Sequence, residues 1–139
     1  MDITVYDKLY DVTKNGFADF NAKSAYKVKL SHVATKDTEY PLVVMEEITN
    51  LPRGKYYGSR ERISTLGYKF EITAKAFKGK LNVTVCREIM QFITDFMQNK
   101  IGLSLISNNL FPREGTNGEL CRIVLVFQRP FYENKETFI

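Results

Sequence analysis

The side chains that most often carry out catalysis or bind metals are few in this sequence, and they are widely spaced. The only histidine, His32, stands in a stretch where apolar and polar residues alternate, and no HxE or HExxH pattern surrounds it. Such alternation is typical of a half-exposed β-strand, so we interpret His32 as a packed or surface residue of that strand. Zinc sites need several ligands at short spacing, and the sequence predicts no catalytic metal centre.

The carboxylates and thiols give no acid–base or nucleophilic pair. Glu46 and Glu47 are adjacent at the end of a predicted strand, so their side chains point to opposite faces and do not act on one substrate together. A solvated strand end or an ion pair between subunits is the expected role. Cys86 and Cys121 lie far apart with no CxxC pattern. They predict neither a disulfide framework nor a zinc site and favour a reducing compartment.

The remaining motifs exclude nucleotide and membrane functions. The glycines match neither GxGxxG nor GxxxxGK[ST] and are typical of turns. No apolar run approaches the ~20 residues that span a bilayer, and the N-terminus lacks the pattern of a signal peptide. We therefore expect a cytoplasmic protein that binds neither a cofactor nor a membrane. It is expected not to be an enzyme and to act through contacts with other molecules.

Periodicity predicts the elements that position these residues in a single α+β domain, residues 1–139. Apolar spacing of i, i+4, i+7 predicts a helix from Asp2 to a stop at Gly16, and a second from about Asn82 to Lys100. Pro130 is expected to end the last strand, and 108–118 to form a polar loop. Strands are predicted at 26–32, 40–45, 68–76, 103–107 and 120–128. A sheet of about five mostly antiparallel strands, with both helices packed on one face, buries the apolar sides of the helices.

A basic segment stands out between residues 53 and 80, with eight basic residues against two acidic ones. Its first part, about 50–62, contains Pro52, Gly54 and Gly58 and predicts an exposed loop or protruding hairpin, called the arm below. A basic arm with tyrosines can contact phosphate, an acidic protein surface or a neighbouring subunit. We favour a solvated arm over a nucleic-acid site, because no RRM, KH or zinc-finger signature is present. The candidate contact residues are Arg53, Lys55, Tyr56, Tyr57, Arg60 and Arg62.

The C-terminal tail, residues 131–139, is unusually apolar for a segment after the last predicted strand. Its candidate contact residues are Phe131, Tyr132 and Phe138. Four apolar side chains, counting Ile139, are expected to pack either on the domain itself or on a partner.

The strand Tyr40–Glu47 (YPLVVMEE) is preceded by a helix and a short strand. It is followed by the basic arm, an alternating strand, a long amphipathic helix and two closing strands. This order, over most of the chain, resembles the tail-terminator proteins of long-tailed bacteriophages and prophage elements, also called tail-completion or tail-to-head joining proteins.

The resemblance implies a structural protein of the virion tail or neck, assembled in the cytoplasm of the bacterial host. It implies a homo-oligomeric ring, expected to be a hexamer, that caps the tail tube, ends its polymerisation and joins the tail to the head. Its partners would be the tail-tube protein and the head connector or neck protein, with non-specific contact to DNA in the lumen. It implies no catalytic residues, and it makes the arm and the tail candidate contacts between subunits or along the axis.

Two alternative functions fit the same sequence features. In the same setting, the chain could be a neck or head-closure protein on the portal side. In a different class, it could be a small basic nucleic-acid-binding module, which predicts salt-dependent binding by the monomer.

Overall fold

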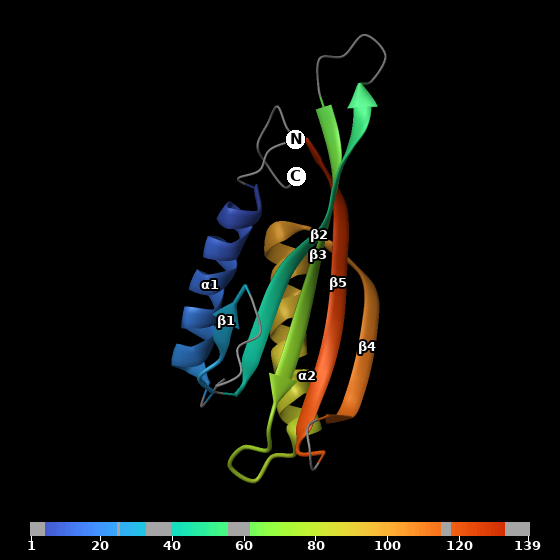
Figure 1. The fold of residues 1–139 in the computed structure, drawn as a ribbon. Helices are drawn as coiled ribbons and strands as arrows, with labels where there is room; N and C mark the ends of the chain where they lie inside the picture. The colour runs from blue at the N-terminus through green and yellow to red at the C-terminus, as the bar shows by residue number, and fades with distance from the viewer. Residues whose placement is uncertain (1–4, 25, 33–39, 56–61, 115–117, 133–139) are drawn as a thin grey trace.

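The computed structural model describes residues 5–24, 26–32, 40–55, 62–114 and 118–132. The described chain follows the predicted α-β-β-β-α-β-β order, and the α+β class is confirmed (Figure 1). The elements are α1 (Val5–Lys23), β1 (Lys29–Ser31), β2 (Leu42–Lys55), β3 (Arg62–Ala74), α2 (Asn82–Asp95), its π-helical continuation η1 (Phe96–Ile101), β4 (Ser104–Glu114) and β5 (Leu120–Tyr132).

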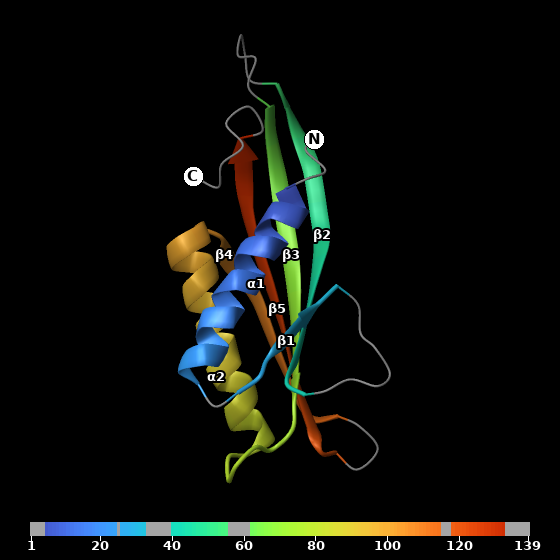
Figure 2. The ribbon, with the colours of Figure 1, turned by 90° about the vertical axis from the view of Figure 1, so that its left-hand side faces the viewer.

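The five strands form one mixed, mostly antiparallel sheet in the order β1-β2-β3-β5-β4. The pairs β2–β3, β3–β5 and β5–β4 are antiparallel, whereas β1 runs parallel to β2. β1 is short and pairs only with Leu42 to Val44. Both helices cover the same face of the sheet, and the other face carries no helix formed by the described residues (Figure 2).

The core lies between this helix layer and the sheet. Side chains that alternate along the long strands meet one side of α2, as the sequence pattern predicts. On β3, Phe70 and Ile72 are fully buried, and the Phe70 ring packs edge-on against Phe127 of β5 with ring centroids 5.7 Å apart. The buried side chains of α2 are Val85, Cys86, Ile89 and Ile93.

The prediction that Gly16 ends the first helix is wrong, because α1 continues to Lys23. Gly16 lies inside the helix, where a Cβ would come within 2.7 Å of the Phe96 ring. The glycine therefore lets α1 approach η1 closely and does not act as a helix stop. Phe17, which lies beyond the predicted stop, is a buried residue of α1 and packs against Phe92, with ring centroids 5.0 Å apart.

The second helix has the predicted extent but not a uniform geometry. It begins at Asn82 as an α-helix and becomes a π-helix at Phe96. Gly102 adopts a left-handed conformation with φ 86°, and its N–H donates to the Met97 carbonyl at 2.7 Å. Gly102 therefore ends the helix.

Four strands extend beyond their predicted ends. β2, predicted over 40–45, runs to Lys55. β3 begins at Arg62, and β4 runs to Glu114 through the expected polar loop. β5 passes Pro130 and reaches Tyr132. Beyond Gln128, however, β5 has no pairing with β4 in the described chain. Pro130 thus lies where the strand is open on one side, and a residue without an N–H is tolerated there.

Candidate interaction surface

The predicted arm is a two-stranded extension of the sheet. Arg53 and Lys55 belong to the end of β2, and Arg62 begins β3. Lys55 is paired with Arg62, so the protruding-hairpin interpretation holds for the backbone on both sides of residues 56–61. Three other candidate contact residues lie outside the described chain: Tyr56, Tyr57 and Arg60.

The beginning of the predicted C-terminal tail is part of the sheet. Phe131 and Tyr132 belong to β5 and pair with Ser64 and Ile63 of β3, so a separate tail starting at residue 131 is a wrong prediction for these two residues. Phe138 lies outside the described chain. The base of the arm and the end of β5 therefore lie side by side at one end of the sheet (Figure 1). The sequence marks both segments but does not indicate that they meet.

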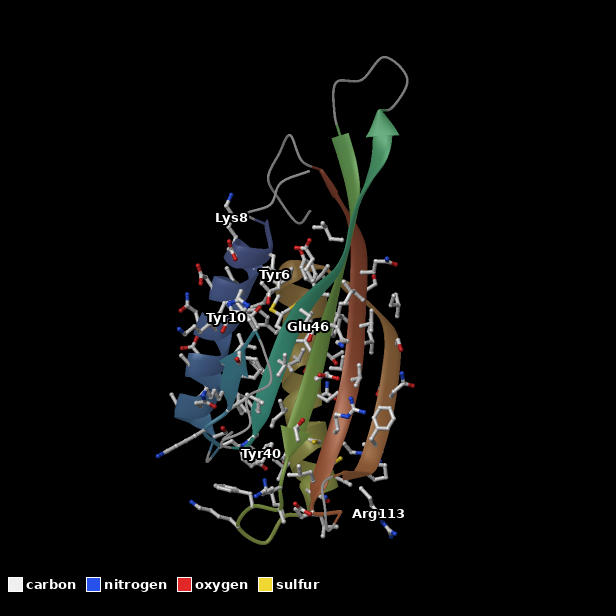
Figure 3. The ribbon with its side chains drawn as sticks, in the orientation of Figure 1. Tyr6, Lys8, Tyr10, Tyr40, Glu46 and Arg113 are labelled. Carbon is white, nitrogen blue, oxygen red and sulfur yellow. The ribbon has the colours of Figure 1, made fainter. Side chains whose placement is uncertain are left out.

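An aromatic cluster joins the start of α1 to the β1–β2 edge (Figure 3). The Tyr6 hydroxyl donates to the Met45 carbonyl at 2.6 Å and lies 2.7 Å from Nδ1 of His32. The Tyr10 ring stacks on His32 with ring centroids 3.8 Å apart, and its hydroxyl donates to the Leu30 carbonyl at 3.1 Å. Burial, together with the nearby Tyr10, raises the pKa of Tyr6 to about 12. His32 is thus an exposed residue beside β1 that holds α1 in place.

The two cysteines are buried next to each other. The Cys86 thiol of α2 donates to the Cys121 carbonyl of β5 at 3.1 Å, and both side chains are fully buried. Burial raises the pKa of each thiol. A reactive cysteine needs a lowered pKa and access to solvent, so these two residues serve packing.

A chain of alternating charges crosses the helix-free face from β2 to β5. The Glu46 carboxylate lies 3.3 Å from Lys69 Nζ, which is 4.0 Å from Glu71. Glu71 accepts a hydrogen bond from Arg122 at 2.9 Å, and the Arg122 guanidinium lies 4.4 Å from the centre of the Phe111 ring. All four charged side chains are partly exposed. The sequence predicts the strand alternation but not which charges become neighbours across the strands.

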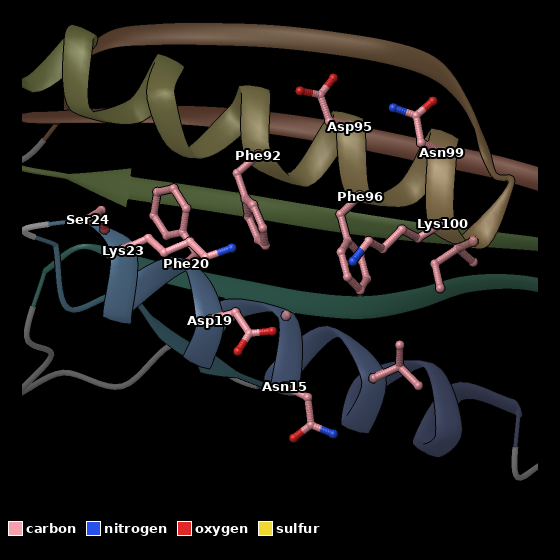
Figure 4. A pocket seen from close by; sticks show the side chains of 13 residues that line it. Asn15, Asp19, Phe20, Lys23, Ser24, Phe92, Asp95, Phe96, Asn99 and Lys100 are labelled. Atoms are coloured by element: carbon pink, nitrogen blue, oxygen red, sulfur yellow. The ribbon is translucent and has the colours of Figure 1, made fainter.

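A groove of about 740 Å³ separates α1 from α2 and η1 (Figure 4). Its lining includes the aromatic rings of Phe20, Phe92 and Phe96, and charged side chains from both helices. Lys100 Nζ lies 5.8 Å from the centre of the Phe96 ring, so its stem covers part of the apolar surface. The groove can receive an apolar group, but it contains no nucleophile paired with a base among the described side chains.

The described part of the chain contains no group of three His, Cys, Asp or Glu side chains that could hold a metal ion. Within the same residues, no helix is long and apolar enough to cross a membrane. The features that the geometry offers are two strand edges, an extended hairpin and a charged sheet face, all of which are means of contact.

No protein-family model matches this chain, and no curated protein is detectably similar to it.

Proposed function

We propose that this protein is a structural subunit that assembles into a closed ring, expected to be a hexamer, at the end of a bacteriophage tail tube. The ring would end polymerisation of the tube and join the tail to the head connector. The proposal follows the resemblance described above and stays within it: it assigns no catalytic residue, cofactor or metal.

The observation that supports the proposal best is that both edges of the sheet remain available for strand pairing. The described residues leave β4 without a neighbour on one side, and they leave the far half of β2 without a neighbour on the other. Two different unpaired surfaces on one subunit are what a head-to-tail contact requires, and such a contact closes into a ring when the rotation between neighbours returns to its start.

The hairpin supplies the second requirement, which is a contact along the axis. β2, β3 and β5 extend together beyond the helix layer, and β2 and β3 continue furthest (Figures 1 and 2). An element that projects from one end of a ring subunit can reach the adjacent ring of tube subunits or the connector. Its basic and tyrosine residues suit such an interface.

The test is the mass of the protein in solution by light scattering, alone and with the tail-tube protein of the same phage. A ring, alone or on the tube end, with shortened tubes in electron micrographs, is the expected result. A strict monomer that also ignores the tube would count against the assignment. Alanine at Tyr56, Tyr57, Arg60 and Arg62 together should abolish joining; intact assembly and joining in this variant would remove the arm from the proposal.

A further inference from the structure

The outer edge of β4 lacks most of the protection that edge strands usually carry. Such strands avoid pairing with other chains through charged residues, prolines or irregular register. Residues Ser104 to Phe111 contain no charge, and Pro112 and the register irregularities lie toward the ends of the strand. The stretch Ser107–Phe111 is regular, and Ile106, Leu110 and Phe111 expose 56%, 39% and 38% of their surface. An edge of this kind is suited to pairing with a strand of another chain.

The opposite side of the sheet offers a partner edge of similar length. β1 covers only Leu42 to Val44, and the Tyr6 hydroxyl occupies the carbonyl of Met45. From Glu46 to Lys55, no described residue pairs with β2 on the side away from β3. This stretch begins with acidic residues and exposes Ile48, 46% of whose surface is accessible.

We infer that β4 of one copy pairs antiparallel with the Glu46–Lys55 edge of β2 in the next copy, so that the sheets of successive copies join into one continuous sheet. The inference rests on the proposed function only in taking the neighbours to be copies of this chain. Each long strand is antiparallel to the next, so β2 and β4 run in opposite directions within a subunit. A rotation about the ring axis preserves the sense of each strand along that axis and brings the two edges together as an antiparallel pair.

One register satisfies both charge and apolar complementarity. Placing Glu46 opposite Arg113 of the neighbour, whose side chain is exposed at the far end of β4, also places Ile48 opposite Phe111 (Figure 3). Opposite charges and apolar pairs facing each other across strands both stabilise a sheet. β1 excludes a register in which β4 pairs with Leu42 to Val44 of the neighbour, because it already occupies that edge.

The same register is consistent with closure of the subunits into a ring. Within one copy, Glu46 is level with Ser107, through the paired residues Lys69 and Val126. Because β4 carries an extra residue between Phe111 and Glu114, facing Arg113 requires an offset of about five residues, or about 17 Å at about 3.3 Å per residue. Over four long strands about 4.8 Å apart, this offset corresponds to a tilt of about 40° from the ring axis, within the 35–45° of closed barrels.

The direction of the offset also orients the subunit. Seen from the helix-free face, β2 lies on the left and β4 on the right (Figure 1). With that order, the offset follows the right-handed coiling of barrel strands only if the helices lie outside the ring. The helix-free face, with its alternating charges from Glu46 to Arg122, then faces the lumen, and the groove between α1 and η1 faces outward.

The experiment is oxidative crosslinking of the full-length Ile48→Cys/Phe111→Cys variant with copper phenanthroline, read on a non-reducing gel. Cys86 and Cys121 are fully buried, so the new thiols are the accessible ones among the described residues. We expect a ladder of covalent oligomers that reducing agent collapses, with at least tenfold less product from either single variant. The matched control is Ile48→Cys/Ile106→Cys, whose second site is more exposed than Phe111 but lies about five residues out of register.

The outcomes separate this inference from the proposed function. If light scattering shows an oligomer but the control crosslinks as well as the Phe111 pair, the edge pairing is wrong while the ring stands. If the protein stays monomeric at every concentration and forms no ladder, the edge pairing is overturned. If the ladder forms but the oligomer neither binds tail tubes nor joins tails, the edge pairing stands and the assignment to the tail fails.

Discussion

The two faces of the sheet are formed by the same strands but differ in burial and in charge. On β5, Ile123 and Leu125 point toward the helices and are at most 2% exposed, whereas the intervening Val124 is only half-buried on the other face. The helix-covered face is apolar and closely packed. The helix-free face combines small apolar side chains with the charge chain from Glu46 to Arg122.

This difference indicates where stability and contact are located. Apolar burial supplies most of the folding free energy, and it is concentrated on the helix-covered face. The helix-free face and the two strand edges contribute less to folding and remain available to a neighbour. Substitutions on the two faces should therefore differ in both the size and the kind of their effects.

The largest effect is expected in the core. Phe70→Ala removes a fully buried ring that packs against Phe127, and we expect it to lower the free energy of unfolding by about 3–5 kcal/mol. Val126→Ala, on the half-buried opposite face, is the matched control and should cost about 1 kcal/mol. Urea denaturation measures both. Similar losses in the two variants would contradict the difference between the faces.

Two tyrosines sharpen the comparison within the helix-covered side. The Tyr68 hydroxyl is buried and has no hydrogen-bond partner among the described residues, so Tyr68→Phe should leave stability unchanged or raise it by up to about 1 kcal/mol. Tyr6→Phe removes the hydrogen bond to Met45 and should cost about 1–2 kcal/mol by thermal or urea unfolding. A large loss in the Tyr68 variant would show that its hydroxyl has a partner after all.

Tyr6 also predicts a dependence on alkaline pH. Its pKa is raised from 10.0 to about 12 in the folded protein. A raised pKa gives stability that is fully present below the unfolded value and is lost as pH rises through the folded value. Between about pH 10 and pH 12, the wild type should therefore lose more stability than Tyr6→Phe. Parallel unfolding profiles for the two proteins would contradict this.

A charge exchange tests the strand edges with a smaller effect. Glu46→Arg and Arg113→Glu should each weaken self-association about fivefold, or about 1 kcal/mol per contact, and the double variant should recover most of the loss. Analytical ultracentrifugation measures the association constants. Asp11→Arg, at an exposed position of α1, is the control for a change of charge alone. An equal loss of association in that control, or no recovery of association in the double variant, would show that Glu46 and Arg113 do not face each other across the contact.

The smallest effect is expected at Glu88, at the end of the domain opposite the arm. The Tyr26 hydroxyl, followed by Lys80 at 2.9 Å, lowers the pKa of this carboxyl. A lowered pKa gives stability that is present above the unfolded pKa and is lost as pH falls through the folded one. Because the Glu88 side chain is 40% exposed, acidification should cost the wild type only about 0.5 kcal/mol more than Glu88→Gln. Identical acid unfolding curves for the wild type and Glu88→Gln would contradict the stabilising contacts of Glu88 with Tyr26 and Lys80.

The sequence predicts the fold well where its periodicity is strong. The alternation of Tyr68 to Ala74 and the i, i+4, i+7 spacing of α2 both reflect burial of one side, and burial is what the structure provides. The ends of the helices and strands are less well predicted. The structural roles of Gly16 and Pro130 depend on residues distant in the chain. Gly16 makes room for the Phe96 ring, and Pro130 is tolerated in β5 because pairing with β4 has ended before it.

The candidate contact residues divide in the same way. Composition alone identifies the basic arm and the apolar C-terminal segment, because charge, glycine and aromatic content are local properties of the sequence. That the two segments meet at one end of the sheet depends on the pairing of β3 with β5.

By itself, the sequence therefore determined that the chain is an α+β domain without a recognisable catalytic or metal motif, since residue types and local periodicity carry that information. Only the tertiary structure decided which strand edges stay open and which charges line the helix-free face. Strand order and register arise from contacts between residues far apart in the chain, and no local pattern encodes them.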